Sequence, residues 1–351
     1  EYSKPYSPCV SPRCETCRGC FCARATRGGF AAIKLQEMSA NANPAVSINN
    51  SNSQTFLKSR GDWRTLIIAA LVYVGWFATV FTHKQLPWWA TFALLTWFGA
   101  WHLSLQHELV HGHPFRNPKL NAALASLSVT LWVPFLSSKR DHISHHNATL
   151  THPELDTESY YSLPESWQKS NRLLRGIYWA NRTLAFRLTV WSVFSAVQYF
   201  LADAWRAIRN VGNARSAWLL HIPALVAIVL IVNTWAGMSM FEYLIGGVFG
   251  SHSLNMMRSF AEHKTLGNET SRTAMIDAGW LMSILMLNNN LHIAHHDEPS
   301  TAWYLVPETA DRTKAYERAE KIGTLYKGGY GEIIRRFTFK PYDQPVYSKA
   351  V

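Results

Sequence analysis

Four long apolar segments interrupt an otherwise polar chain, and they come in two pairs. The first pair, residues 64–81 and 88–105, is joined by the short link THKQLP; the second, residues 217–235 and 241–257, is joined by the uncharged AGMSM. As helices that rise 1.5 Å per residue, segments of this length are about long enough to cross the ~30 Å hydrocarbon core of a bilayer. The pattern predicts an all-α integral membrane protein with four transmembrane helices, arranged as two hairpins.

Two further apolar segments differ from these four. Residues 189–208 show a helical apolar stripe that is broken by Gln198 and Asp203, which favours a helix lying on the membrane over one that crosses it. Residues 278–287 are too short to span the bilayer, so we expect them to lean on its surface.

The composition supports a membrane protein and narrows the choice of partners. The chain holds 15 Trp, 14 Tyr and 17 Phe with only 16% charged residues, and Trp and Tyr typically anchor helices at membrane interfaces. The formal net charge is +11, yet no nucleic-acid-binding motif accompanies it, so we expect no nucleic-acid partner. Anionic lipid headgroups and an acidic redox protein explain the positive charge better.

The two ends of the chain differ from the region between them. All five cysteines lie within the first 22 residues, which excludes a fold built on disulfides. We expect residues 1–57 to be a disordered, Cys-rich and polar extension, with Met38 as a plausible start of the native protein. Residues 58–310 would form the membrane domain, and residues 311–351 a C-terminal cytoplasmic tail.

Eight of the 15 histidines fall in three short clusters, which read HELVH, HISHH and HIAHH. Residues three or four apart share one face of a helix, so each cluster directs its imidazoles one way. Neutral imidazole is the commonest metal ligand among side chains. The spacing therefore predicts one metal centre assembled from distant segments, with the ligands His107, His111, His142, His145, His146, His292, His295 and His296.

The ligand set favours two irons over other metals. Structural zinc takes four ligands and usually includes Cys, and a blue-copper site needs a Cys and Met arrangement that these clusters do not offer. Two irons, each held by four or five imidazoles with one position open for O2, would use the histidines with little left over. Redox-active metals in an all-nitrogen ligand set at a membrane surface indicate oxygen activation.

The metal centre also constrains the membrane topology. If residues 120–136 crossed the bilayer, the first two clusters would face opposite sides, so we expect this segment to dip into the membrane or lie at its interface. Four spans then place the three clusters and both termini on one side. The Lys- and Arg-rich loops identify that side as the cytoplasmic one.

The motifs HELVHGH, HISHH and NNNLHIAHH resemble the three histidine boxes of the membrane fatty acid desaturase/hydroxylase superfamily, over roughly residues 60–310. The resemblance implies a non-haem di-iron oxidoreductase that uses O2 and takes electrons from a separate carrier of the ferredoxin or b-type cytochrome class. It implies a lipid or acyl substrate into which a double bond is introduced. Hydroxylation or ketolation of a lipid, carotenoid or sterol on the same scaffold is the alternative.

The resemblance adds candidates around the boxes. The family usually has one more histidine ligand just after its last span, and His263 lies at that place. An Asn four residues earlier holds a water-linked position in the acyl-CoA desaturases, whereas this chain has Ser259 there. Carboxylate or amide groups that hold the second ring nitrogen of a ligand would support the site. The candidates for such a supporting role are Glu108, His113, Asp156, Asn289 and Asp297.

Two other classes of function compete with this interpretation. HELVH also satisfies the H-E-x-x-H pattern of zinc metalloproteases, in which Glu108 would act as the base, but an intramembrane protease would leave the other two clusters unexplained. A metal transporter would place ionisable groups within its spans, whereas these clusters fall at span ends and in loops.

Overall fold

The computed structural model describes residues 57–265 and 272–348, and helices make up most of them. These residues belong to one unit, which extends from Ser53 to Val351. The extension predicted at residues 1–57 lies outside the described residues except for Leu57. A two-stranded parallel sheet accompanies the helices: β1 (Met275–Ile276) pairs with β2 (Leu325–Tyr326).

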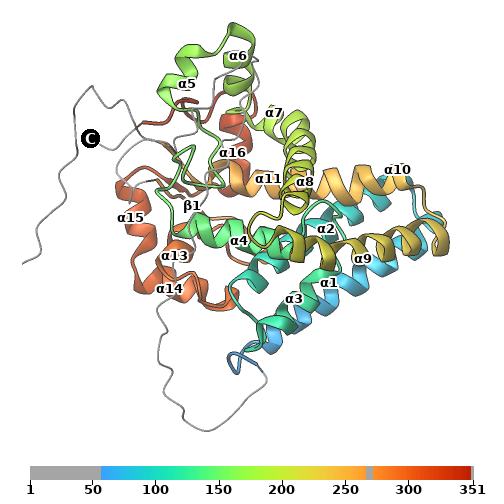
Figure 1. Cartoon of the computed structure of the whole chain (residues 1–351). Coiled ribbons are helices and arrows are strands. Elements are labelled where there is room, and N and C mark those ends of the chain that lie inside the picture. Colours follow the sequence, from blue (N-terminus) through green and yellow to red (C-terminus); the bar gives the residue numbers. More distant parts are fainter. Residues whose placement is uncertain (1–56, 266–271, 349–351) are drawn as a thin grey trace, which may run out of the picture. The chain divides into compact units, whose positions relative to one another are not determined.

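The first long pair of helices is α1 (Trp63–Thr82) and α2 (Trp88–Val110). One 3-10 turn, η1 (His83–Gln85), extends α1, and Pro87 then precedes α2 in an extended conformation. Proline suits this place because its missing N–H would have no partner at a helix start. The two helices pack along each other: α1 runs toward the right of Figure 1, and α2 returns.

The second long pair begins with α9 (Ala214–Val229), which continues through the π-helical η3 (Leu230–Trp235). The return arm is one uninterrupted helix made of α10 (Met240–Tyr243), the π-helical η4 (Leu244–Gly250) and α11 (Ser251–Glu262). A capping box starts this arm: the Ser239 hydroxyl accepts from the Glu242 N–H, and the Glu242 carboxylate accepts from the Ser239 N–H. Both η4 and α11 pack on α2.

Close contact between α2 and the return arm depends on small residues. A Cβ on Gly99 of α2 would stand 2.0 Å from Ser251 Oγ, and a Cβ on Gly250 would stand 2.3 Å from Thr96 Oγ1. Glycine at these places lets the two backbones approach, as small residues do between membrane helices. The approach fixes the end of α2 relative to the end of α11.

Among the described residues, three helices are long and apolar enough to cross a membrane: Trp63–Gln85, Leu184–Ile208 and Ala214–Trp235. Two of these match the first and third predicted spans. The other two predicted spans, in α2 and in the arm at 240–262, do not reach the same hydropathy. The remaining candidate, Leu184–Ile208, contains the segment 189–208 that was expected to lie on the membrane surface. It comprises α7 (Leu184–Phe186), the π-helical η2 (Arg187–Trp191) and α8 (Ser192–Ile208), and α8 runs in a different direction from α1 and α9 in Figure 1.

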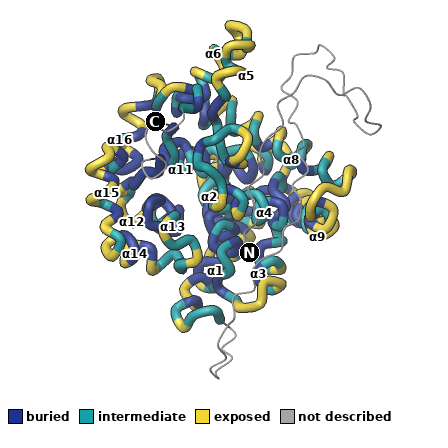
Figure 2. Tube along the Cα trace, turned by 60° about the vertical axis from the view of Figure 1, so that its left-hand side comes forward, coloured by how far each residue is buried: buried dark blue, intermediate teal, exposed yellow. Residues whose placement is uncertain are grey.

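The candidate spans expose apolar side chains on one face. On α1, Leu71 is 49% exposed and Val74 66%; on α9, Leu219 is 70% exposed and Val226 53%. Exposed apolar surface of this extent indicates contact with lipid or another apolar partner. Figure 2 shows the exposed stretches of α9 in contrast with the buried and intermediate residues of α2 and α4.

The short predicted segments are short in the structure as well. Residues 120–136 form α3 (Pro118–Ser126) and then a non-helical stretch, so they do not make a helix long enough to cross a bilayer. The segment 278–287 contains α12 (Gly279–Leu285). Trp280 of α12 is 80% exposed and Leu281 46%, which fits the surface-leaning role expected for it.

Shorter helices gather beside the ends of the long ones, on the left and at the top of Figure 1. They are α4 (Phe135–His146), α5 (Pro164–Lys169), α6 (Arg172–Ala180), α13 (His292–Asp297), η6 (Trp303–Leu305), α14 (Val306–Arg312), α15 (Ala315–Lys321) and α16 (Gly329–Phe337).

The residues that the sequence analysis assigned to a C-terminal tail are packed into this region. Ile333 and Phe337 of α16 are buried in the same apolar core as Leu109 of α2 and Phe260 of α11. The C-terminal part therefore supports the helix ends that carry the histidines, although the domain boundary itself stays a prediction.

Candidate metal centre

Helix ends place all nine candidate histidines. His107 lies in the last turn of α2 and His111 caps its C-terminus; His263 directly follows α11. The second cluster occupies the last two turns of α4, and the third opens α13. Because α2 packs against both α4 and α11, these helix ends meet at one place.

The histidines form two compact groups of four. The first group is His107, His111, His142 and His295, and the second is His145, His263, His292 and His296. Within each group, one nitrogen from every ring lies within 4.8 Å of the others. The first cluster contributes His107 and His111 to the first group, whereas the second and third clusters are divided between the two groups, so that neighbours such as His295 and His296 belong to different groups.

His146 lies between the two groups. Its Nε2 is 3.0 Å from Nε2 of His142 and 3.1 Å from Nε2 of His295, both in the first group. Its ring also contacts that of His296 in the second group, with centroids 4.6 Å apart. The ninth ring therefore adjoins both groups.

The spacing of the ring nitrogens fits metal coordination. The Nε2 atoms of His111 and His142 are 3.1 Å apart, those of His263 and His292 are 3.0 Å apart, and those of His292 and His296 are 3.2 Å apart. Two ligands at right angles on one metal, with metal–nitrogen bonds of about 2.1 Å, also stand about 3 Å apart. The rings thus converge as ligands of a common ion do.

Two buried ring nitrogens near the groups lack a hydrogen-bond partner in the described part of the chain. His145 Nε2 and His146 Nδ1 are buried and have no hydrogen-bond partner among the described residues. A buried polar atom without a partner costs free energy, so such atoms usually have an ion or a water as their partner. Neutral imidazoles have lone pairs to give to a metal, and the residues present fit one metal in each group.

Oxygen acceptors fix the tautomer of three rings. Nδ1 of His145 donates to Asp156 Oδ1 at 2.7 Å, and Nδ1 of His142 donates to Glu158 Oε1 at 2.7 Å. Nδ1 of His292 donates to the amide oxygen of Asn289 at 3.0 Å. With the proton held on Nδ1, the lone pair is on Nε2, which is the atom that faces the other rings.

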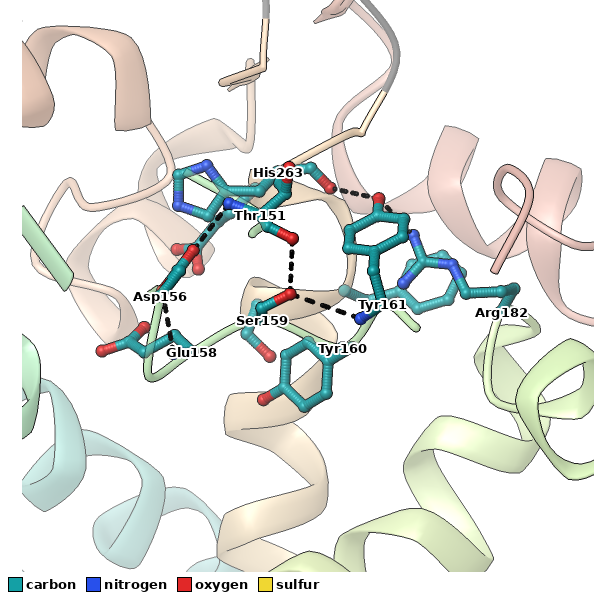
Figure 3. Close-up of a pocket in the computed structure, with 11 residues that line it drawn as sticks. Thr151, Asp156, Glu158, Ser159, Tyr160, Tyr161, Arg182 and His263 are labelled. Carbon is teal, nitrogen blue, oxygen red and sulfur yellow. Dashed lines mark hydrogen bonds between the residues drawn. The ribbon is translucent and has the colours of Figure 1, made fainter. Parts of the chain in front are cut away.

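The loop after α4 is folded so that Asp156 points at His145. The second oxygen of Asp156 accepts the N–H of Thr151 at 2.7 Å, while Oδ1 also accepts the N–H of Glu158 at 2.9 Å (Figure 3). An Asp side chain bonded to nearby backbone N–H groups stabilises a turn. This turn brings Glu158 back toward His142, so one loop supplies acceptors to ligands of both groups.

Charge around the site is unevenly distributed. Burial would raise the pKa of the Glu158 carboxyl, but the imidazoles of His145 and His142 hold this pKa well below its ordinary value. Burial opposes a charge on His145 too, yet Glu158 and Asp156 raise the pKa of His145 to about 9 in the metal-free protein. Burial lowers the pKa of His146 and of His263 to about 3. The carboxylates thus offset positive charge on the side where a cation would bind.

Three of the five supporting candidates have partners other than the ligand rings. The Glu108 carboxylate accepts the backbone N–H of Trp303 at 3.1 Å. His113 Nδ1 is 3.0 Å from Asp62 Oδ1, and Asp297, at the outer end of α13, pairs with Arg318. Among the described residues, no hydrogen bond joins any of these three side chains to a ligand ring.

The other two candidates, Asp156 and Asn289, do contact ligand rings. Asn289 touches both groups, because its amide nitrogen is 3.4 Å from His107 Nε2 while its oxygen accepts from His292. The sequence analysis missed Glu158 as a partner of His142. The sequence did contain a signal for Glu158, because this carboxylate follows the candidate Asp156 by two residues in the same loop after the second cluster.

A small cavity adjoins the second group. Glu158, Tyr160, Ser259, Glu262 and His263 line it, together with the Thr151–Asp156 turn and the Tyr161–Arg182 pair (Figure 3). Ser259 stands where the acyl-CoA desaturases have an Asn. Its hydroxyl lies 3.4 Å from the Met256 carbonyl oxygen, on the cavity side of α11.

The fold and the site define a class: helical, membrane-associated proteins with a histidine-built candidate metal centre. The family model described as fatty acid desaturase matches residues 84–327, well over half of the chain, and the chain belongs to this family. No curated protein gives a significant match. Family membership makes the chain an oxidoreductase of the desaturase/hydroxylase type.

Proposed function

We propose that the chain is an O2-dependent fatty acyl desaturase that binds two irons and inserts a double bond into an alkyl chain. The observation that carries the proposal is the pair of four-histidine groups with His146 between them. The first iron would be held by His107, His111, His142 and His295, and the second by His145, His263, His292 and His296. Two redox-active ions side by side would pass electrons from an external donor to O2 and so allow oxidation of unactivated carbon, which a single zinc, having no redox chemistry, does not.

The chain's own residues hold these ligands in place. Asp156, Glu158 and Asn289 each keep a proton on Nδ1 of a ligand ring, which directs the Nε2 lone pair inward. Such outer partners typically contribute 10- to 100-fold, by order of magnitude, to metal affinity or activity. The buried core around Leu109 and Phe260 excludes water from the side of the centre that faces the long helices.

The membrane arrangement supported best has four spans, α1, α2, α9–η3 and α10–α11, with α8 along the surface. The Lys58 ammonium, just before α1, donates to the carbonyl of His111 at 3.0 Å, and the Asn213 amide, just before α9, donates to the carbonyl of Leu136 at 3.1 Å. Both outgoing helices therefore start at the histidine end, to which α2 and α11 return. We place this end and both termini on the cytoplasmic side, because its loops are rich in Lys and Arg.

Desaturation is preferred to the protease reading for a geometric reason. A metalloprotease base must reach the metal-bound water, whereas the Glu108 carboxylate is bound to the N–H of Trp303. Hydroxylation or ketolation of a lipid, carotenoid or sterol uses the same two groups of ligands and stays the alternative outcome.

We further propose that electrons come from a separate acidic carrier, of the ferredoxin or b-type cytochrome class, that docks on the basic loops. Arg172 on α6 is exposed, while the Arg175 guanidinium donates to the carbonyls of Trp167 and Gln168. Charge reversal at Arg172 is therefore the cleaner probe, because the same change at Arg175 would also disturb α5.

Lipid profiling of a host that expresses the chain tests the proposed function. We expect a new double bond in the host's acyl chains that disappears when His145→Ala replaces the native chain, while Asp297→Asn retains it. A new hydroxyl or keto group with the same dependence on His145 would identify the alternative reaction. A product that persists in His145→Ala would refute the metal centre as the catalyst.

A further inference from the structure

The last described segment, residues 341–348, crosses the loop that follows the second histidine cluster. The N–H of Ser162 donates to the carbonyl of Pro345 at 2.9 Å, and the N–H of Tyr347 donates to the carbonyl of Ser162 at 2.9 Å. These two bonds make a short parallel bridge between Ser162 and Val346. The segment is thereby fixed to the loop that carries Asp156 and Glu158.

The same segment also holds the stretch that carries His263. The N–H of Ser348 donates to Thr265 Oγ1 at 2.8 Å, and the Arg272 guanidinium donates to the Ser348 carbonyl at 2.8 Å. Arg272 reaches the other loop too, since it donates to the Leu150 carbonyl at 2.8 Å. Residues 341–348 thus join two loops that are far apart in sequence and that both support the second group.

Tyr161 is the centre of this junction. Its hydroxyl donates to Asp343 Oδ2 at 2.5 Å and accepts from Arg182 at 2.8 Å and from the N–H of Thr265 at 3.0 Å. The carbonyl of His263 lies 3.3 Å from the same hydroxyl (Figure 3). Arg182 and Asp343 are each only 2% exposed as side chains, and Arg182 Nε donates to Asp343 Oδ1 at 2.6 Å.

His263 needs support of this kind because α11 ends directly before it. Its backbone is extended, with φ −129° and ψ 139°, so it lies outside the helical hydrogen-bond pattern that fixes other ligands. Its ring nevertheless stands in the second group, 3.0 Å from His292 Nε2. The bonds of the Tyr161 hydroxyl to the His263 carbonyl and to the Thr265 N–H therefore help to set where the ring of His263 points.

We propose that Tyr161, held by Asp343 and Arg182, is a positioning residue that keeps His263 in the second group, so that the C-terminal segment is part of the metal site. The inference rests on the proposed function for the identity of the metal. It assigns residues 341–348 a role in occupancy of the second group and leaves the first group independent of them.

The test compares Tyr161→Phe with Tyr330→Phe in the full chain. Both changes delete one buried hydroxyl, but the hydroxyl of Tyr330 has no hydrogen-bond partner among the described residues. Purified proteins are titrated anaerobically with ferrous iron, and bound iron per chain is measured. Hydrogen–deuterium exchange of residues 261–265 is measured in the metal-free proteins. It reports whether the hydrogen bonds around Tyr161 are formed, whichever metal the native protein binds.

We expect Tyr330→Phe to bind iron as the native chain does, and Tyr161→Phe to bind about half as much at a free iron concentration that just fills both groups of the native chain. Affinity at the second group should fall roughly 10- to 100-fold, and excess iron should restore occupancy in Tyr161→Phe but not in His263→Ala. Exchange at residues 261–265 should accelerate in Tyr161→Phe alone.

Native iron affinity and native exchange in Tyr161→Phe would overturn the inference. So would an unfolded Tyr161→Phe protein, judged by its helical circular dichroism, because the proposed effect is local. A native chain that binds no iron but shows the expected exchange difference would refute the proposed function and leave the positioning role standing.

Discussion

At the scale of single residues, the centre depends on which nitrogen of each ring carries the proton. Asp156 is the clearest case: it is 4% exposed and binds His145 and two backbone N–H groups at once. The sequence allowed Asp156 to be named, because a carboxylate near a histidine cluster is a reasonable partner. It could not separate Asp156 from Asp297, since only the fold decides that one faces a ligand and the other Arg318.

Asp156→Asn should weaken metal binding about 10- to 100-fold. An amide presents either its oxygen or its NH2 group, so the proton on His145 Nδ1 is no longer held by a charge-assisted bond. Iron affinity measured by anaerobic titration checks this expectation. Asp297→Asn is the matched control, because it removes an exposed ion pair that contributes only about 0–1 kcal/mol; equal losses in the two variants would argue against tautomer control.

Acidification should destabilise the metal-free protein. Burial lowers the pKa of His146 and of His263 to about 3, and it also lowers the pKa of His292 and His296. The unfolded chain therefore binds more protons below about pH 6.5, and the free energy of unfolding falls as the pH drops from there toward 3.

Above about pH 6.5, His145 makes the free energy of unfolding fall as the pH rises. Its pKa is raised to about 9, so its contribution is complete below about pH 6.5 and is lost as the pH rises through 9. Thermal unfolding of the metal-free protein in detergent should give the highest Tm near pH 6.5 and a lower Tm at pH 5. A Tm that increases steadily on acidification would contradict buried neutral imidazoles.

At the scale of elements, the hydrophobic pattern predicted where the long helices lie more reliably than whether each one crosses the membrane or lies on its surface. The segments around 64–81 and 217–235 are helical and apolar enough to span. Segment 184–208 is too, although Asp203 in it is fully buried and receives hydrogen bonds from Arg140 and Trp218. Hydrophobic periodicity shows that one face of a helix is apolar. It does not show whether protein or lipid covers that face.

Gly99→Ala should destabilise the protein by about 1–3 kcal/mol and lower its activity. The new Cβ would meet Ser251 Oγ and the Gly247 carbonyl, which pushes α2 away from the return arm and moves His107. Thermal unfolding and product formation measure the two effects. Gly176→Ala is the control, because space is open there and Ala favours an exposed helix by about 0.5–1 kcal/mol; indistinguishable behaviour of the two variants would contradict close α2–α11 packing.

At the scale of the whole described unit, distant parts of the chain converge on one place. The three clusters could be identified from the sequence because the spacing of their histidines carries the signal, whereas His263 was identified only through the family resemblance. The contribution of residues 341–348 could not be predicted from the sequence, because no local pattern distinguishes Tyr161 or Asp343 from an ordinary polar residue on the surface. Their role follows from burial and from contacts made across more than 100 residues of sequence.

The metal content of the purified chain tests the central claim most directly. Iron and zinc are measured per chain in the native protein, in His295→Ala for the first group and in His296→Ala for the second. The account predicts about two irons in the native chain and at most one in either variant. A single zinc that is lost in His107→Ala but kept in His296→Ala would contradict it and favour the H-E-x-x-H site.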